Sequence, residues 1–222
     1  MYNSGIDVSK TESGVSTGLY AVDGGPNRCW WCQGHVDYEA YHDNEWGQPI
    51  ADDQLLFEKI CLEGFQSGLS WLIILRKREA FRKAFCDFNY SEIAHFEAHH
   101  VRKLMQNAGI IRNRSKIEAT INNAQRALEM EEEFGSLGVF FWQFEPKLKR
   151  AALKSKADAC FHTTSDESRQ MSKALKKRGW KFVGPTTAYA FIQSMGMTND
   201  HLQNCCCHQR VEDLRSSFKR PM

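Results

Sequence analysis

Glu63 and Trp71 have side chains that together could bind a small planar molecule. They lie eight positions apart in the segment Cys61–Trp71, with Gly64 and Gly68 between them. Glycines that bend the chain between two apolar helices would leave the acid and the ring near the bend. There they could line a pocket with one polar anchor and one flat face. On these residues alone, a solvated glutamate and a core tryptophan are the preferred interpretation, because that is where both residue types usually occur.

Cysteine and histidine residues at both ends of the chain could bind a metal ion. Cys29 and His42 lie thirteen positions apart near the start. His201 and Cys205 lie four positions apart near the end, on one helical face if Thr198 begins a last helix. Two Cys and two His are a common tetrahedral zinc set, and here they would tie the two ends of the chain together. The spacing is not that of a standard zinc finger, so rival ligands stay open: Cys32, Cys206, Cys207 and His208.

The chain has eight cysteines, and their role depends on the cell compartment. In an intracellular protein we expect thiols or metal ligands rather than disulfides. The spacing Cys29-Trp-Trp-Cys32 also fits a redox pair, and a set of buried free thiols is a further alternative. No alternating strand–helix pattern of the thioredoxin type accompanies this spacing, which argues against the redox pair.

The segment Leu104–Arg112 predicts two helices joined by a tight turn. An amphipathic helix ends at Gly109, two isoleucines would fill the inside of the turn, and the next helix begins near Asn113. Glycine permits such a turn, and a helix N-terminus presents N–H groups to a DNA phosphate. An ordinary helix–helix corner with a solvated basic face fits equally well. Three cations could assist phosphate binding: Arg112, Arg114 and Lys116.

Helical periodicity dominates the chain from Asp52 onward and predicts the elements that would position these residues. We expect helices at 53–64, 69–86, 98–107, 113–134, 138–144, 166–178 and 186–196. Asp52 or Asp53 can cap the first of them, and the segment Thr164–Glu167 reads as a capping box. Gly184 followed by proline suits the start of the last. Residues 145–163 show no period and predict a basic crossover, while 41–47 predict a turn.

Length and charge set broad limits. The 222 residues suit one large domain or two small lobes, and the net charge of +2 argues neither for nor against nucleic acid. Residues 1–27 contain five Gly and four Ser and predict a disordered extension, and 208–222 predict a flexible tail. The basic run Lys173–Lys181 is best explained as a solvated helix face. We expect a cytoplasmic protein, because no apolar run is long enough to span a membrane and no signal peptide is evident.

Taken in order, several motifs resemble the bacterial 3-methyladenine DNA glycosylase I family. No single motif is specific, but together they run across residues 28–207, which we take as the folded domain. The matching segments are Arg28–Cys29, Tyr41–Gly47, Leu62–Gly64, Gly68–Trp71, Ala108–Arg112, Lys176–Gly179, Phe182–Gly184 and Asn199–His201 with Cys205.

The resemblance implies an all-α helix–hairpin–helix DNA glycosylase fold of two helical lobes. It also implies a structural zinc that ties the N- and C-terminal segments together. The zinc ligands of the family match Cys29, His42, His201 and Cys205. The acid of the base pocket matches Glu63, and the pocket aromatics match Tyr41 and Trp71, with Trp31 and Trp46 nearby. The expected DNA contacts are Gly109, Arg112 and Arg114.

The implied activity is excision of 3-methyladenine from alkylated double-stranded DNA by a monomer. Methylation at N3 makes the base a cation and a good leaving group, so flipping and recognition are the main tasks of the protein. Trp71 would stack on the base, while Glu63 and Tyr41 would offer hydrogen bonds. The family lacks the catalytic Asp of its helix–hairpin–helix relatives, so no residue is assigned as the base that activates water.

Two other functions remain as alternatives. A zinc-stabilised DNA-binding module without catalysis would keep the hairpin and the Cys/His set, although the retention of Glu63, Tyr41 and Trp71 argues against it. A thiol oxidoreductase would use Cys29 and Cys32. The chain also departs from the family in its two terminal extensions, in the extra thiol Cys32, and in Ser67, where alanine is usual.

Overall fold

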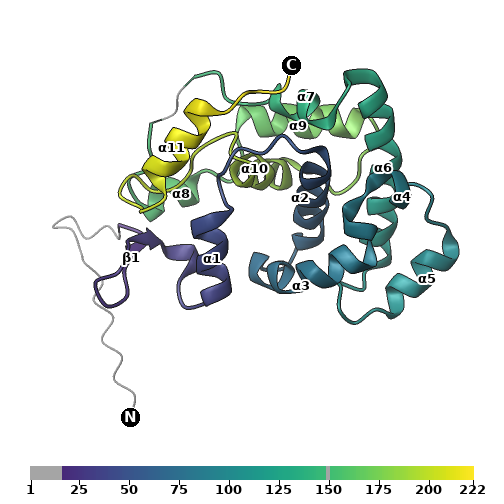
Figure 1. The fold of residues 1–222 in the computed structure, drawn as a ribbon, viewed down its shortest axis with the longest axis horizontal. Helices are drawn as coiled ribbons and strands as arrows, with labels where there is room; N and C mark the ends of the chain where they lie inside the picture. The colour runs from purple at the N-terminus through teal and green to yellow at the C-terminus, as the bar shows by residue number, and fades with distance from the viewer. Residues whose placement is uncertain (1–16, 149–150) are drawn as a thin grey trace, which may run out of the picture.

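The computed structural model describes residues 17–148 and 151–222, and in these ranges the regular elements of the chain are mostly helices, as expected (Figure 1). The helices are α1 (Val36–Asn44), α2 (Asp53–Gln66), α3 (Trp71–Ala84), α4 (Tyr90–Ile93), α5 (Ala98–Gln106), α6 (Arg114–Phe134), α7 (Leu137–Trp142), α8 (Lys156–Phe161), α9 (Asp166–Lys177), α10 (Pro185–Ser194) and α11 (His208–Ser217). Two 3₁₀ turns, Trp30–Cys32 and Cys86–Phe88, complete the helical elements of these ranges. No helix in the described ranges is both long and apolar enough to cross a membrane.

The longer helices lie where the sequence places them, and several begin with a recognisable cap, although Ser70 makes no side-chain cap bond at the start of α3. The side chain of Asp52 accepts a hydrogen bond from the backbone N–H of Leu55 and so caps α2. Pro185 occupies the first turn of α10, where its missing N–H costs nothing. The capping box of α9 is formed by Ser165 and Ser168 rather than by the predicted Thr164–Glu167.

Four shorter helices were not predicted, and two of them replace expected irregular segments. The expected turn at 41–47 overlaps α1, and the expected crossover at 145–163 contains α8, which Ser155 and Asp158 cap reciprocally. The other two are α4 and α11. Length alone does not explain the difference, because α5, α7 and α10 are no longer than α11 and were predicted.

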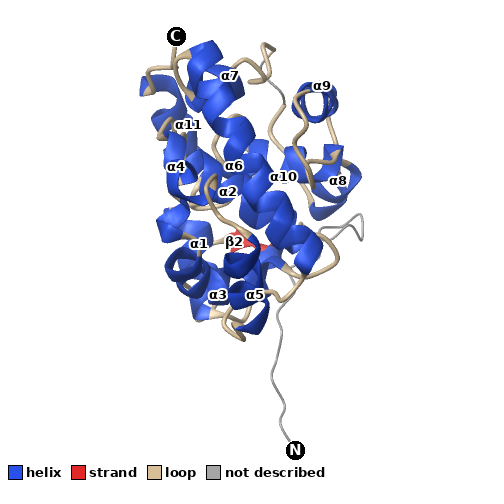
Figure 2. Cartoon of the chain, turned by 90° about the vertical axis from the view of Figure 1, so that its right-hand side faces the viewer, coloured by secondary structure: helices blue, strands red, loops and turns tan. Residues whose placement is uncertain are grey.

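The two ends of the chain differ from the expected disorder. Residues 1–16 lie outside the described residues, but within 17–27 the strand β1 (Leu19–Tyr20) pairs antiparallel with β2 (Arg28–Cys29), the strand labelled in Figure 2. The expected flexible tail contains α11, and Val211 on that helix is fully buried. Arg215 donates to Glu145 at 3.1 Å, which fixes α11 to the end of α7. One buried valine and an ion pair leave no clear pattern in a polar sequence, so periodicity could not predict this helix.

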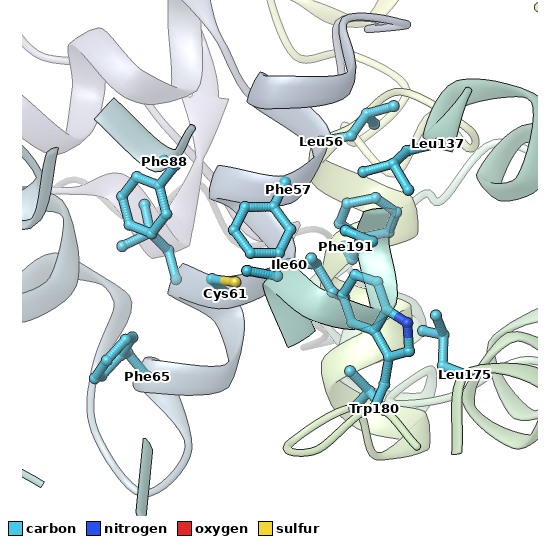
Figure 3. Packing of buried hydrophobic residues seen from close by; sticks show 14 of the residues in the cluster. Leu56, Phe57, Ile60, Cys61, Phe65, Phe88, Leu137, Leu175, Trp180 and Phe191 are labelled. Atoms are coloured by element: carbon cyan, nitrogen blue, oxygen red, sulfur yellow. The ribbon is translucent and has the colours of Figure 1, made fainter. Parts of the chain in front are cut away.

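Helix α2 lies in the middle of the molecule and carries much of the core (Figure 1). Figure 3 shows Phe57 of α2 with Phe88 on one side and Phe191 and Trp180 on the other. These aromatic rings are buried, and burying a large apolar side chain stabilises the fold by roughly 1.5–3 kcal/mol. Because α2 packs against α3, α6, α7 and α10, its polar residues are held in fixed positions.

Candidate active site and metal centre

The five residues predicted to form the base pocket line one cavity of about 320 Å³. Helix α1 supplies Tyr41, α2 supplies Glu63, and α3 begins with Trp71. Gly68 makes the turn between α2 and α3 with φ +81°, a conformation that glycine adopts without strain. The bend inferred from the sequence therefore places the acid and the ring in one pocket. The remaining members of the predicted set are Trp31 and Trp46.

Aromatic rings form a wall of this pocket. The rings of Tyr41 and Trp71 are 5.5 Å apart at their centroids, and Trp31 meets Trp46 edge-on at 4.9 Å. Trp71 is only 7% exposed, and its indole N–H has no hydrogen-bond partner among the described residues. A buried donor without an acceptor is costly, so it marks a place where a ligand with an acceptor atom would be favoured.

The opposite side of the pocket comes from segments that the sequence analysis did not assign to a site. Helix α10 contributes Tyr189 and Gln193, both of which donate to the carboxylate of Asp200, at 2.6 and 2.8 Å. Helix α8 contributes Cys160 near the rim. The sequence signal for Asp200 was its place in the family-matching segment Asn199–His201, whereas Tyr189, Gln193 and Cys160 belong to no motif.

Glu63 is buried, as a base-binding acid would be, but it already has a cationic partner. The side chain is 5% exposed, and its Oε1 lies 3.2 Å from Nζ of Lys59, one helical turn earlier on α2. Burial raises the pKa of the Glu63 carboxyl, and the Lys59 ammonium partly opposes that rise. The interpretation preferred from Glu63 and Trp71 alone, that the glutamate is solvated, is therefore wrong.

Lys59 is the main pocket-related residue that sequence reasoning missed. Its Nζ donates to the hydroxyl of Tyr41 at 2.5 Å and lies 3.5 Å from the ring centroid of Trp71. Burial lowers the pKa of Lys59 to about 8, mainly because the ammonium has lost its hydration. The available signal was its spacing of four from Glu63 on a helix, which is the spacing of a helical ion pair.

The predicted metal ligands meet in one buried cluster. Cys29, His42, His201 and Cys205 are each at most 5% exposed, and their ligand atoms lie within 4.8 Å of one another. Sγ of Cys205 lies 3.4 Å from Nε2 of His42 and 3.5 Å from Nδ1 of His201. Zinc bonds of about 2.3 Å to sulfur and 2.0–2.1 Å to nitrogen give tetrahedral S–N edges of about 3.5 Å, so the cluster fits that ion.

Groups outside the cluster hold its ligands in the orientation that zinc requires. Nδ1 of His42 contacts the carboxylate of Asp43 at 2.8 Å, and Nε2 of His201 lies 3.1 Å from the carbonyl oxygen of Trp46. Such partners fix the histidine tautomer and leave the other nitrogen free for a metal. Burial also lowers the pKa of His201 to about 3, which keeps the imidazole neutral.

Of the rival thiols, Cys32 has other partners, whereas Cys206 and Cys207 lie beside the cluster. Sγ of Cys32 contacts the carbonyl oxygen of Cys29 at 3.2 Å and the hydroxyl of Tyr20 at 3.4 Å, which are not metal-binding partners. Burial raises the pKa of Cys32 to about 12, so it is a poor thiolate and a poor redox nucleophile. Cys206 is exposed, and Sγ of Cys207 lies 3.8 Å from Nδ1 of His42, the nitrogen that contacts Asp43. The ligand atoms of Cys206 and Cys207 also lie within 4.8 Å of that of Cys205, so these two thiols stay rival ligands.

One detail of the predicted metal site is wrong. His201 and Cys205 were expected on one face of a last helix begun by Thr198, but residues 195–207 form turns. The side chain of Asn199 accepts from the backbone N–H of His201 and donates to the carbonyl oxygen of His208, and these bonds shape the turn. Side chains that bond to nearby backbone groups compete with helix formation, which explains the difference.

The two sites touch through aromatic rings. Trp31 meets the ring of His42 at 5.1 Å, and Trp46 meets the ring of His201 at 4.6 Å. Both tryptophans also line the pocket. The metal cluster therefore supports part of the pocket wall directly.

A turn joins α5 to α6, with Arg112 and Arg114 exposed, and α5 ends at Gln106 rather than at the expected Gly109. Gly109 has no positive φ, so backbone freedom is not the reason for a glycine there. Space is the reason, because a Cβ atom would lie 2.9 Å from Cβ of Ala80. The N–H of Gly109 donates to the side chain of Asn107 at 2.9 Å. This N–H group is therefore already hydrogen-bonded within the turn and is not available to a DNA phosphate.

Lys116, expected to assist phosphate binding, points inward instead. Its Nζ donates to the carbonyl oxygens of Phe65 and Ser67 at 2.8 and 2.6 Å, at the C-terminal end of α2. Unpaired carbonyls at a helix end accept such a cation readily. The candidate DNA-facing charges of this hairpin are therefore Arg112 and Arg114.

Comparisons with known proteins agree with this geometry. The family model described as methyladenine glycosylase matches residues 31–208. The chain is similar to DNA-3-methyladenine glycosylase 1 of Escherichia coli, with 46% identity over 184 residues that cover 82% of this chain and 96% of the relative. A crystal structure of a 3-methyladenine DNA glycosylase I superimposes with a TM-score of 0.77 at 46% identity, covering 82% of this chain and 99% of that one.

A second solved structure concerns ligand recognition in a relative. It is described as the structural basis of 3-methyladenine recognition by 3-methyladenine DNA glycosylase I from Staphylococcus aureus. The match has a TM-score of 0.75 at 37% identity and covers 79% of this chain and 93% of that chain.

Proposed function

The chain belongs to the methyladenine glycosylase family, and on this premise we propose that it removes 3-methyladenine from alkylated double-stranded DNA by hydrolysing the N-glycosidic bond. The observation that carries this proposal is the pocket of about 320 Å³ with a buried carboxylate, Glu63, beside a ring with an unpaired donor, Trp71. A pocket of this kind suits a flat molecule with hydrogen-bonding edges.

In this proposal the damaged nucleotide turns out of the duplex and its base enters the pocket. Trp71 supports one face of the base, since base–aromatic stacking contributes roughly 1–3 kcal/mol per base. The Glu63 carboxylate accepts hydrogen bonds from the base edge, and the Trp71 N–H meets an acceptor atom. The protein thereby selects and holds a base that is already activated by its methyl group.

Cleavage of the N-glycosidic bond needs little protonation of the base by an acidic residue. A base methylated at N3 carries a positive charge and leaves as a neutral molecule, while positive charge develops on the sugar. Water then attacks the sugar carbon. Glu63 is the buried acid assigned to the reaction, and its role lies in holding the base rather than in a defined proton transfer.

A zinc ion fits the cluster formed by Cys29, His42, His201 and Cys205, and we propose a structural role for it. The cluster lies outside the base pocket, and its four protein ligands leave no open coordination position for a substrate. Bound zinc would join β2 and α1 to the turns before α11. The pocket tryptophans that contact the two imidazoles, Trp31 and Trp46, would be fixed at the same time.

DNA contact is proposed at the α5–α6 hairpin. Arg112 is exposed there, and Arg114 is exposed apart from a 3.3 Å contact with Glu118. Lys77 of α3 donates to the carbonyl oxygen of Ala108 at 2.9 Å, so the hairpin is fixed to the helix that begins with Trp71. A phosphate bound at the hairpin would therefore have a set distance from the pocket.

The experiment that tests the function is incubation of the protein with methylated duplex DNA, followed by identification of the released bases. We expect 3-methyladenine among the products and an abasic site in the DNA. A non-catalytic DNA-binding module would bind the same DNA and release no base, and that outcome would overturn the proposal.

A further inference from the structure

Lys59 gives this pocket a charge balance that Glu63 alone would not have. The side chain is 6% exposed, and its ammonium contacts three pocket residues. It lies 3.2 Å from Oε1 of Glu63, 2.5 Å from the hydroxyl of Tyr41 and 3.5 Å from the ring centroid of Trp71. A buried ammonium so close to the wall of a base pocket must influence any charged base that enters.

Lys59 lies behind the wall of the base pocket and not inside that pocket. Tyr41 and Trp71 line the base pocket on one side and a second cavity of about 210 Å³ on the other, and Lys59 lines only the second. A base in the first cavity would therefore meet the rings and Glu63 rather than the ammonium. Lys59 acts on the base through these three residues.

The neighbouring cations have carboxylate partners of their own. Arg78 pairs with Glu45, and Arg82 pairs with Glu58 at 2.8 Å. Lys59 is therefore the cation that balances Glu63. The same ammonium faces Trp71, so the ring attracts a second cation on its other face less strongly than a free indole would.

The reaction moves positive charge away from the base. A methylated adenine is a cation before the bond breaks and neutral afterward, so a negative pocket would stabilise the bound substrate more than the transition state. Interactions that are stronger in the ground state than in the transition state slow the chemical step. An ammonium near the base would reverse part of that effect.

We propose that Lys59 is a positioning residue that balances the Glu63 charge. As a result, the pocket binds a cationic base less tightly and the glycosidic bond of that base is cleaved faster. This inference rests on the proposed excision of 3-methyladenine. It predicts that loss of the ammonium tightens substrate binding and slows bond cleavage together. A residue that only stabilises the fold would not produce that combination.

The test uses Lys59→Met, which keeps the aliphatic volume and removes the charge, in single-turnover excision from methylated DNA. We expect the protein concentration at half-saturation to fall about fivefold and the maximal rate to fall by a similar factor. Lys83→Met is the matched control, since it removes an exposed lysine from α3 and leaves both quantities unchanged. Weaker binding, or an unchanged maximal rate, in Lys59→Met would overturn the inference.

The wild-type protein gives a second measurement that does not depend on the folding of a variant. Because burial lowers the pKa of Lys59 to about 8, the ammonium loses its proton as pH rises from 7 to 9, and binding should tighten while cleavage slows. The other titratable groups facing Lys59 are Glu63, Tyr41, Arg78 and Glu45.

Two of these groups keep their protons in that range. Burial raises the pKa of Tyr41 well above its usual value, and the bond to Glu45 raises that of Arg78. Glu63 and Lys59 therefore titrate as the coupled pair. A wild-type half-saturation concentration that does not fall between pH 7 and 9 would contradict the inference. Absence of 3-methyladenine release by the wild type would instead refute the proposed function itself.

Discussion

The metal cluster and the base pocket lie side by side and share two tryptophans, yet their polar groups are arranged in opposite ways. In the cluster, His42 and His201 both have outer partners, Asp43 and the backbone of Trp46, and their remaining nitrogens converge on one point. At the pocket, the buried Glu63 carboxylate pairs with the Lys59 ammonium behind the pocket wall, and an indole N–H has no described partner. Binding of an ion would satisfy all four ligands of the cluster. In the pocket, the Trp71 N–H has no described acceptor until a base with an acceptor atom enters.

This contrast indicates that the metal cluster contributes mainly to the stability of the fold and the base pocket mainly to ligand recognition. A closed set of ligands stabilises the fold when it is filled. A pocket with buried charges and an unmet donor costs stability, and a ligand that meets those groups recovers part of that cost. Mutations in the two regions should therefore act on different measurements.

The largest effect is expected from His201→Ala in the cluster. Loss of one of four ligands should release the zinc and lower the melting temperature by about 10 °C, as expected for a loss of ~3 kcal/mol in a chain of this size. Metal analysis and thermal unfolding of the purified variant provide the measurement. A metal-free protein with wild-type melting temperature and activity would show that the cluster has no structural role.

Trp71→Ala should have the next largest effect, and it should act on binding. Removal of the ring takes away a stacking surface with ~1–3 kcal/mol as the usual scale, or about 5-fold to 150-fold in affinity for the free base. Titration with 3-methyladenine is the measurement, and zinc content should stay at the wild-type level. Equal affinity in variant and wild type would remove Trp71 from the pocket assignment.

A smaller effect is expected from Arg112→Ala combined with Arg114→Ala at the hairpin. Each lost phosphate contact should reduce the salt dependence of DNA binding by about one unit of slope. The matched control is Lys173→Ala with Lys177→Ala, which removes two exposed cations from α9. If the control lowers the slope and the hairpin variant does not, DNA binds at α9 and not at the hairpin.

The parts of the site that could be predicted from the sequence are those with distinctive residue types. Cys29 and His201 are conspicuous wherever they stand, so the cluster could be predicted although its members come from distant segments. The long helices followed from their periodicity and caps, as α2 with Asp52 shows. These features depend on local chemistry that the sequence displays directly.

The remaining features depend on three-dimensional surroundings. Lys59 and Lys116 look like ordinary surface lysines in sequence, and only packing shows that one faces Trp71 and the other the end of α2. Gly109 was explained by backbone freedom, but its reason is the closeness of Ala80 on another helix. Such relations between distant residues leave no periodic pattern.

The central claim is that Glu63 faces the base, and Glu63→Gln tests it most directly. The substitution keeps the shape but removes the charge and one acceptor, and it leaves Lys59 buried without a counter-charge. Single-turnover excision of 3-methyladenine at a subsaturating protein concentration should be slower because the base binds more weakly, titration with the free base should show the same loss of affinity, and zinc content should be unchanged. If both rate and affinity equal those of the wild type, Glu63 has no role in recognition and the pocket described here is not the active site.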